Sequence, residues 1–153
     1  MKKLVVLFIS LFVTGSVFAQ SADVITEILN SKEMTYGQAC YLCATYQKLI
    51  PDEGSYDDAI EALVNINQLP SKVDASEPIP LGNLAFLFAK IWNVKGGIFY
   101  RITKGSPRYA YKQLKADGII DENKDPSSKI SGIDALNIYT SCSFEYGKIE
   151  LGI

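Results

Sequence analysis

A short segment recurs three times in the sequence, and this repeat constrains the fold more than any other feature. The copies begin at Met34, Ile79 and Ile130, so the second starts 45 residues after the first and the third starts 51 residues after the second. Each copy opens with an apolar residue and a helix-capping or proline residue, and then continues as an apolar run. Because the apolar residues recur at helical spacing, the repeat predicts three copies of one helix.

The residues at each repeat start are typical of a helix N-terminus. Thr35 and Ser131 can accept a hydrogen bond from a free backbone N–H, and Gln38 and Asp134 stand three residues later, where a capping-box partner belongs. Pro80 suits the first turn of the second copy, because a donor there would have no partner. Each copy is therefore expected to begin a helix directly after its cap.

A second amphipathic segment follows each of the first two copies. The residues from Tyr56 align with those from Pro107, and Ser55 and Ser106 precede them as further candidate caps. Matching apolar residues form one face of each segment, so each copy is expected to be a helix pair. The predicted fold is all-α, with repeated helix pairs in one compact bundle or spindle. The five main helices are expected at residues 36–49, 56–67, 80–94, 107–116 and 132–142, with a short helix near 25–29.

The apolar stripe of the aligned helices predicts part of the core. We expect four side chains at or beside this stripe to be buried. They are Leu42, Leu84, Phe88 and Leu136.

Three cysteines accompany the repeat. Cys40 and Cys43 form a Cys-x-x-Cys motif, but a redox motif needs a thiol exposed at a helix start, and Cys43 falls on the inward stripe. Cys142 falls on the same stripe in the third copy. We therefore expect packed thiols, with a candidate disulfide between Cys43 and Cys142, or between Cys40 and Cys142, that would tie the first repeat to the third.

The first 19 residues have the pattern of an export signal. Lys2 and Lys3 precede an apolar run, and Ala19 ends a stretch of small residues that suits a signal peptidase. The residue that follows is not the cysteine that a lipid anchor requires. We expect a periplasmic or secreted protein with no stable membrane insertion after cleavage. Its predicted domains are a signal peptide at residues 1–19 and a single helical repeat domain at residues 20–153.

The composition excludes several classes of function. The 153 residues include no histidine, which removes Ser-His-Asp hydrolases and His-ligated zinc. A formal net charge of −2 is unfavourable for nucleic-acid binding. Acid pairs such as Asp57 and Asp58 stand at a helix start, where they complement the helix dipole, and not across a cleft as in a glycosidase. We expect a non-catalytic protein with no metal and no cofactor.

A family resemblance rests on the segment that leads into the third copy. The motif Gly-Ile-Ile at residues 118–120, a polar loop that contains Pro126, and the cap Ser131 before an apolar helix follow one another. This order resembles the S-layer homology module, which runs from a helix through Gly-Ile-Ile, a turn and a proline to a Thr-Arg-Ala-Glu helix start. The resemblance covers most of residues 34–142, and it implies a helical spindle of three lobes attached non-covalently to cell-wall glycan. The residues at the place of the module's arginine are Tyr36, Leu81 and Gly132.

Charge is segregated along the chain. Residues 49–77 hold seven acids and one base, whereas residues 78–116 hold seven bases and no acid. The aligned second helices carry opposite charges at the same positions, as Asp57 and Arg108 illustrate. Two explanations are open, namely solvated helix faces or a basic face for an anionic glycan or an acidic partner.

An insertion lies inside the basic stretch. Residues 95–108 replace a short turn of the first copy and account for the six residues by which the spacing of 51 exceeds that of 45. Loops that a scaffold does not need often carry binding, although the aromatic residues here could instead plug the gap between lobes. The candidate ligand-binding residues are Tyr100, Arg101, Lys104 and Arg108.

These features favour a non-catalytic binding or structural module of the cell envelope, which contacts wall glycan or an envelope protein. The alternative from another class is a periplasmic thiol-redox accessory protein that uses Cys40 and Cys43. A third hypothesis is an assembly subunit whose Trp92, Phe86 and Tyr41 face a partner protein.

Overall fold

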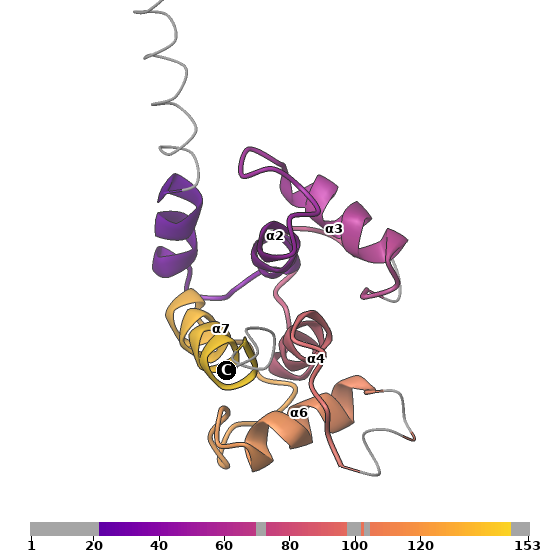
Figure 1. Ribbon diagram of the computed structural model, residues 1–153. Coiled ribbons are helices and arrows are strands. Elements are labelled where there is room, and N and C mark those ends of the chain that lie inside the picture. The colour runs from indigo at the N-terminus through magenta and orange to yellow at the C-terminus, as the bar shows by residue number, and fades with distance from the viewer. Residues whose placement is uncertain (1–21, 70–72, 98–101, 103–104, 148–153) are drawn as a thin grey trace, which may run out of the picture.

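The computed structural model describes residues 22–69, 73–97, 102 and 105–147, and the elements within these ranges are helices (Figure 1). The all-α prediction is confirmed. Residues 22–30 form the first helix of the described part. The others are α2 (Tyr36–Tyr46), α3 (Tyr56–Asn65), α4 (Leu81–Ile91), α6 (Pro107–Ala116) and α7 (Gly132–Tyr146).

The inner helices α2 and α4 each end three residues earlier than the sequence predicts. The chain turns out of α2 at Lys48 and out of α4 at Asn93, and both residues take a positive φ, of 56° and 46°. The N–H of the following residue then donates back to a carbonyl of the helix. Leu49 donates to Ala44 at 2.9 Å in lobe 1, and Val94 donates to Ala89 at 3.0 Å in lobe 2. The two repeats therefore share their helix ends as well as their starts.

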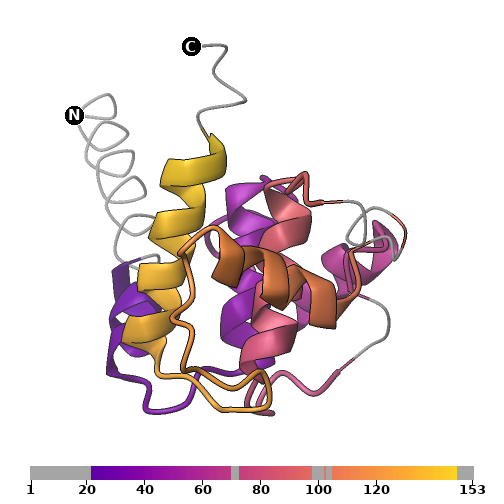
Figure 2. The same cartoon turned by 90° about the horizontal axis from the view of Figure 1, so that it is seen from below.

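The helices pack in pairs around the inner helices. Helix α3 packs on α2 to form lobe 1, and α6 packs on α4 to form lobe 2 (Figure 1). Among the described residues no helix follows α7, and the N-terminal helix at residues 22–30 lies beside it (Figure 2). These two helices form lobe 3, so the chain completes its third pair with a segment that precedes the first repeat.

Lobe 3 depends on a glycine where its two helices meet. The Gly132 N–H donates to the Ser31 carbonyl at 2.9 Å. A Cβ atom at Gly132 would lie 1.7 Å from the Ile28 carbonyl oxygen. Only glycine therefore allows the N-terminal helix to approach α7 so closely.

Backbone hydrogen bonds join the three helix starts in a cycle. The first N–H of α2 donates to the Glu77 carbonyl and that of α4 donates to the Ser128 carbonyl, both at 2.9 Å, just as Gly132 donates to Ser31. Each inner helix thus begins on the loop that leads into the next lobe. At the centre, the Met34 N–H donates to Ile130 and its carbonyl accepts from Ile79. The three repeat starts identified in the sequence are therefore buried side by side.

The predicted caps are mostly confirmed. Thr35 forms the expected capping box with Gln38, and the Ser131 side chain accepts from the Asp134 N–H. Ser106 was expected to cap α6, but its side chain makes no capping bond. The cap of α4 is Pro80 itself, one residue before the first turn.

The core lies between α2, α4 and α7. Leu42, Leu84 and Phe88 are buried as predicted, but Leu136 is only partly buried and packs at the edge of the core. Toward the C-terminal ends of α2 and α4, the rings of Phe88, Trp92 and Tyr139 meet edge to face at centroid distances of 4.9 to 5.8 Å. The Tyr46 ring of α2 also meets Trp92 and Tyr139, at centroid distances of 5.2 and 6.2 Å, so the cluster favours one packed arrangement of the three helices.

The assembly hypothesis placed three aromatic residues at a partner surface, and the structure corrects two of them. Trp92 is 5% exposed and Tyr41 is 2% exposed, because both pack into the core. Phe86 is half-buried, with the Lys90 ammonium 5.3 Å from its ring centroid. Within the described ranges, no helix has the length and apolar character needed to cross a membrane.

Candidate functional site

The structure describes one of the four candidate ligand-binding residues. Arg108 is exposed in the first turn of α6. Tyr100, Arg101 and Lys104 lie outside the described residues.

Arg108 lines a pocket of about 440 Å³ where α4 and α6 begin, which we call the lobe 2 pocket. Its lining is mostly apolar and includes Gly82, Pro107, Tyr111 and Pro126. Two exposed cations, Arg108 and Lys112, stand at its edge, and Asn83 and Ser127 add polar groups. The pocket thus combines apolar surface with positive charge.

Backbone geometry fixes the inner wall of the lobe 2 pocket. The Gly82 N–H donates to the Pro126 carbonyl at 2.8 Å, and a Cβ atom at Gly82 would lie 3.2 Å from that oxygen. The Tyr111 hydroxyl donates to the Lys124 carbonyl, which holds the ring against the wall. The wall is therefore formed before any ligand binds.

In the matching place of lobe 1, a tyrosine side chain fills the space that forms this pocket. Tyr56 stands at the position of Pro107, and its side chain lies against Gly37, the counterpart of Gly82. The Tyr56 hydroxyl donates to a Glu27 carboxylate oxygen at 3.0 Å. The shorter proline leaves this space open in lobe 2.

The electrostatics of the lobe 2 pocket favour an anion. The described residues contain two ion pairs, and neither Arg108 nor Lys112 belongs to them. The nearby Asp125 carboxylate accepts the Ser127 N–H at 2.7 Å and also its hydroxyl, and these bonds lower the pKa of Asp125 below its usual value. The Asp125 carboxylate therefore stays ionised, and its hydrogen bonds shape the turn. The Lys112 ammonium lies 5.6 Å from the Tyr109 ring centroid, and both exposed cations can contact a negatively charged ligand.

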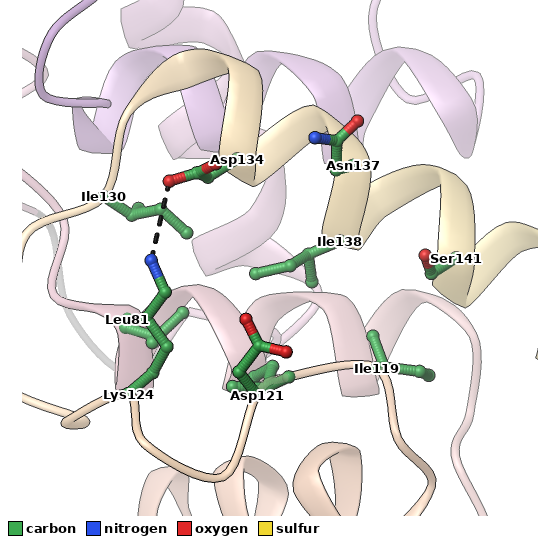
Figure 3. A pocket seen from close by; sticks show the side chains of 10 residues that line it. Leu81, Ile119, Asp121, Lys124, Ile130, Asp134, Asn137, Ile138 and Ser141 are labelled. Atoms are coloured by element: carbon green, nitrogen blue, oxygen red, sulfur yellow. Dashed lines mark ion pairs between the residues drawn. The ribbon is translucent and has the colours of Figure 1, made fainter.

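A second cavity, of about 180 Å³, lies between α7 and the loop that follows α6 (Figure 3). Aliphatic side chains, among them Ile120 and Ile138, form its floor. Lys124 and Asp134 face each other across its mouth at 3.6 Å between ammonium and carboxylate. The sequence analysis did not identify this cavity.

The repeat alignment contained a signal for that second cavity. Asn137 and Ser141 line it, and they stand at the positions of Phe86 and Lys90 in lobe 2. The smaller polar side chains leave space that the larger pair would cover. Taken alone, each of them is an ordinary polar residue of an exposed helix face, so only the comparison between copies marks the place.

The three cysteines are free thiols buried in the core. Burial raises the pKa of Cys40 and of Cys142 to about 12 each, and the pKa of Cys43 is raised by burial and by the nearby Cys40 and Cys142. The thiolate is the reactive form of cysteine, so such thiols react slowly at neutral pH. The Cys43–Cys142 bridge is not formed in the structure and stays a prediction.

No acidic or metal-ligating cluster forms another site in the described part of the chain. Asp52, Glu53, Asp57 and Asp58 are exposed, and Asp58 caps α3 by accepting the Ser55 N–H. No group of three or more cysteine and carboxylate side chains there could hold a metal ion. The lobe 2 pocket is therefore the strongest candidate for the site.

We compared the chain with protein-family models, with curated proteins and with solved structures, and it matches none of them. Its function therefore has to be inferred from its own residues.

Proposed function

We propose that the protein is a non-catalytic binding module of the cell envelope and that the lobe 2 pocket holds an anionic group of the wall glycan. The observation that carries this proposal is the combination of an apolar floor with two exposed cations, Arg108 and Lys112. The apolar face of a sugar ring would pack on Tyr111 and the prolines. A carboxylate or phosphate on that ring would then lie between the two cations.

The resemblance to the S-layer homology module supports the same class of ligand. The described helices form three pairs whose inner helices begin side by side, which is the arrangement that the resemblance implies. The motif's arginine is replaced by Tyr36, Leu81 and Gly132. A charge for the ligand must therefore come from another place, and Arg108 and Lys112 stand beside the start of α4.

A co-sedimentation experiment with purified cell-wall sacculi tests the proposal. The protein should bind sacculi that carry their anionic polymer, and binding should weaken as salt rises, because exposed charges are screened over about 8 Å at 0.15 M ionic strength. The variant Arg108→Ala with Lys112→Ala should bind about tenfold or more weakly, since each charge-assisted bond contributes more than a neutral one.

Two further variants make this experiment specific. Pro107→Tyr should fill the pocket as Tyr56 fills lobe 1, and it should abolish binding while both cations remain. Lys32→Ala removes an exposed cation in the turn before the first repeat and should bind like the unmodified protein. Equal losses for Lys32→Ala and the pocket variants would reduce binding to a general charge effect and contradict the proposed site.

Export through a cleaved signal is part of the proposal. The charged start and apolar run of residues 1–19, which lie outside the described residues, support it. Mass spectrometry of protein from the soluble envelope fraction should give Gln20 as the first residue. A first residue of Met1, or recovery in detergent alone, would contradict export in soluble form.

The thiol-redox hypothesis is less well supported by the described residues. A redox motif needs an exposed thiol with a lowered pKa, whereas burial raises the pKa of Cys40 to about 12. Titration of the folded protein with a thiol reagent at pH 7 is expected to label Cys40 and Cys43 only as fast as the protein unfolds. Rapid labelling of one of them would favour the redox hypothesis.

A further inference from the structure

The outward surfaces of α3 and α6 carry opposite charges at matching positions. Asp57 and Glu61 are exposed on α3, and Arg108 and Lys112 are exposed on α6 with the same spacing of four residues. Residues four apart lie on the same side of a helix, about one turn from each other. We call the first pair the acidic α3 face and the second pair the basic α6 face.

The surroundings of each face have the same sign of charge as the face itself. Residues 49–69 contain five acids and no base, and Glu53 and Asp58 are exposed among them. Residues 105–116 contain three bases and no acid, and the third base is the half-buried Lys115. Each face therefore attracts a surface of the opposite sign and is not neutralised by its own neighbours.

Within a single chain the two faces do not cover each other. Helix α3 packs on α2 and α6 packs on α4, so the outer helices lie on different sides of the α2–α4 pair (Figure 1). The ion pairs of the described residues join Lys124 to Asp134 and Lys129 to Glu33, and neither includes a residue of these faces. A second copy of the chain, in contrast, carries a complement to each face.

We propose that the protein self-associates head to tail, with the acidic α3 face of one copy on the basic α6 face of the next. The equal spacing allows Asp57 and Glu61 of one copy each to meet a cation of its neighbour. The two faces differ, so the contact is heterologous and can continue from copy to copy. Exposed ion pairs are individually weak and are screened by salt, so the association is reversible and strongest at low ionic strength.

This inference does not depend on the glycan proposal, although both use Arg108 and Lys112. A glycan bound at the lobe 2 pocket would occupy the same cations as the α3 face of a second copy. The two ligands of the basic α6 face would therefore compete, and self-association is to be measured on purified protein without glycan.

Sedimentation velocity on charge-reversed variants tests the contact. The unmodified protein should form larger species as its concentration rises at 0.01 M ionic strength, and these should dissociate at 1 M, because the screening length falls from about 30 Å to about 3 Å. The acidic-face variant is Asp57→Lys with Glu61→Lys, and the basic-face variant is Arg108→Glu with Lys112→Glu. Each alone should associate about tenfold or more weakly, because its two faces then have the same sign.

Combining all four substitutions in one chain tests the pattern of charge. This chain has the net charge of the unmodified protein, and its two faces are again opposite in sign, so it should assemble like the unmodified protein. The control Asp121→Lys with Glu145→Lys makes the same change of charge as the acidic-face variant at two exposed acids outside both faces, and it should also assemble.

Three results would overturn the proposal. The first is an unmodified protein that stays monomeric at every concentration in 0.01 M salt. The second is a four-fold variant that does not assemble although it is folded. The third is a control at Asp121 and Glu145 that loses assembly as the acidic-face variant does, since net charge alone would then explain the loss.

Two variants separate self-association from glycan binding. Pro107→Tyr fills the lobe 2 pocket but keeps both cations, so it should assemble and fail to bind sacculi. The acidic-face variant leaves that pocket unchanged, so it should bind sacculi and fail to assemble. Failure of either proposal thus leaves the other measurable. Loss of assembly in a folded Pro107→Tyr protein would place the contact in the pocket and contradict pairing of the two charged faces.

Discussion

Lobes 1 and 2 are built on one backbone plan but carry different surfaces. Both outer helices begin after a serine, and both end in a residue of positive φ, Asn67 after α3 and Gly118 after α6. Both lobes also carry an Asp-x-Ser turn before the next repeat, with Asp74 in one and Asp125 in the other. The shared features are turns, caps and backbone hydrogen bonds, which hold the pairs together.

The outer helices of the two lobes differ on their outward face. Tyr56 fills the space that Pro107 leaves open, and the charges of Asp57 and Glu61 are replaced by those of Arg108 and Lys112. None of these residues belongs to an ion pair within the described part of the chain. The scaffold can therefore tolerate a change of charge and volume there, and one lobe can become a binding surface while the other stays closed.

The largest expected effect concerns the inner helices, where the lobes are also unequal. Phe88 and Cys43 occupy the same register position, and both are fully buried. Phe88→Ala should reduce the free energy of unfolding by about 3–5 kcal/mol, because the aromatic cluster around Trp92 cannot collapse into the space. Cys43→Ala should cost about 1 kcal/mol, since only a sulfur atom is removed. Urea unfolding measures both, and equal losses would contradict the packing described for the two positions.

The sequence predicted the repeated parts of this fold well, because a repeat supplies its own alignment. The starts of α2, α4 and α7 and the capping box at Thr35 were identified in this way. The pairing of residues 22–30 with α7 was missed, since no second copy of that segment exists to compare. The contact requires glycine at position 132, because a Cβ atom there would collide with the Ile28 carbonyl oxygen. The sequence alone does not show that these two residues are neighbours.

The candidate site was predicted only in part. Arg108 was identified from its charge, but the space next to it depends on Pro107 and Gly82, which look like ordinary helix-start residues. A cavity forms where no side chain fills the space between elements. Local sequence patterns predict which side chains are buried, but they do not predict where space is left empty. The comparison of Tyr56 with Pro107 is the signal that would have indicated the pocket.

A smaller effect is expected at the residue that closes lobe 1. Tyr56→Phe removes the hydroxyl that donates to Glu27 and should lower the free energy of unfolding by about 0.5–1.5 kcal/mol. Pro107→Ala, at the same place in lobe 2, removes no side-chain hydrogen bond and should change the free energy of unfolding by about 0.5 kcal/mol or less. Thermal unfolding of both variants checks the difference. A larger loss for Pro107→Ala would show that lobe 2 is closed by contacts at that residue.

Low pH should reduce the stability contributed by the Asp-x-Ser turn of each lobe by a similar amount, because the two turns have the same hydrogen bonds. Hydrogen bonds from Ser76 and Ser127 lower the pKa of Asp74 and of Asp125 in the folded protein. A carboxyl whose pKa is lowered on folding stabilises the protein above its unfolded pKa of about 3.9. That contribution is lost as the pH falls through the folded pKa.

Carboxyl titration by NMR should therefore give lowered pKa values for Asp74 and Asp125. Asp74→Asn and Asp125→Asn should each reduce the acid dependence of stability by a similar amount. An ordinary pKa at one of the two residues would mean that its turn is not held by the serine.

A small expected change in stability accompanies the largest expected change in binding. Arg108→Glu with Lys112→Glu gives lobe 2 the charge signs of lobe 1, and the free energy of unfolding should change by about 1 kcal/mol or less, because exposed charges without ion pairs contribute little. Binding to anionic sacculi should be lost.

The reverse exchange separates the two requirements for binding. Asp57→Arg with Glu61→Lys supplies cations to lobe 1, but Tyr56 still occupies the space, so no second site should appear. Adding Tyr56→Pro should open that space and allow a second equivalent of ligand to bind, which a stoichiometry measurement would detect. If the charge exchange alone created a site, the cations would be sufficient and the open pocket would be unnecessary. If the triple variant stayed folded and bound one equivalent, the difference between the lobes would have to lie in the backbone around Gly82 and Pro126, and not in the side chains of the outer helices.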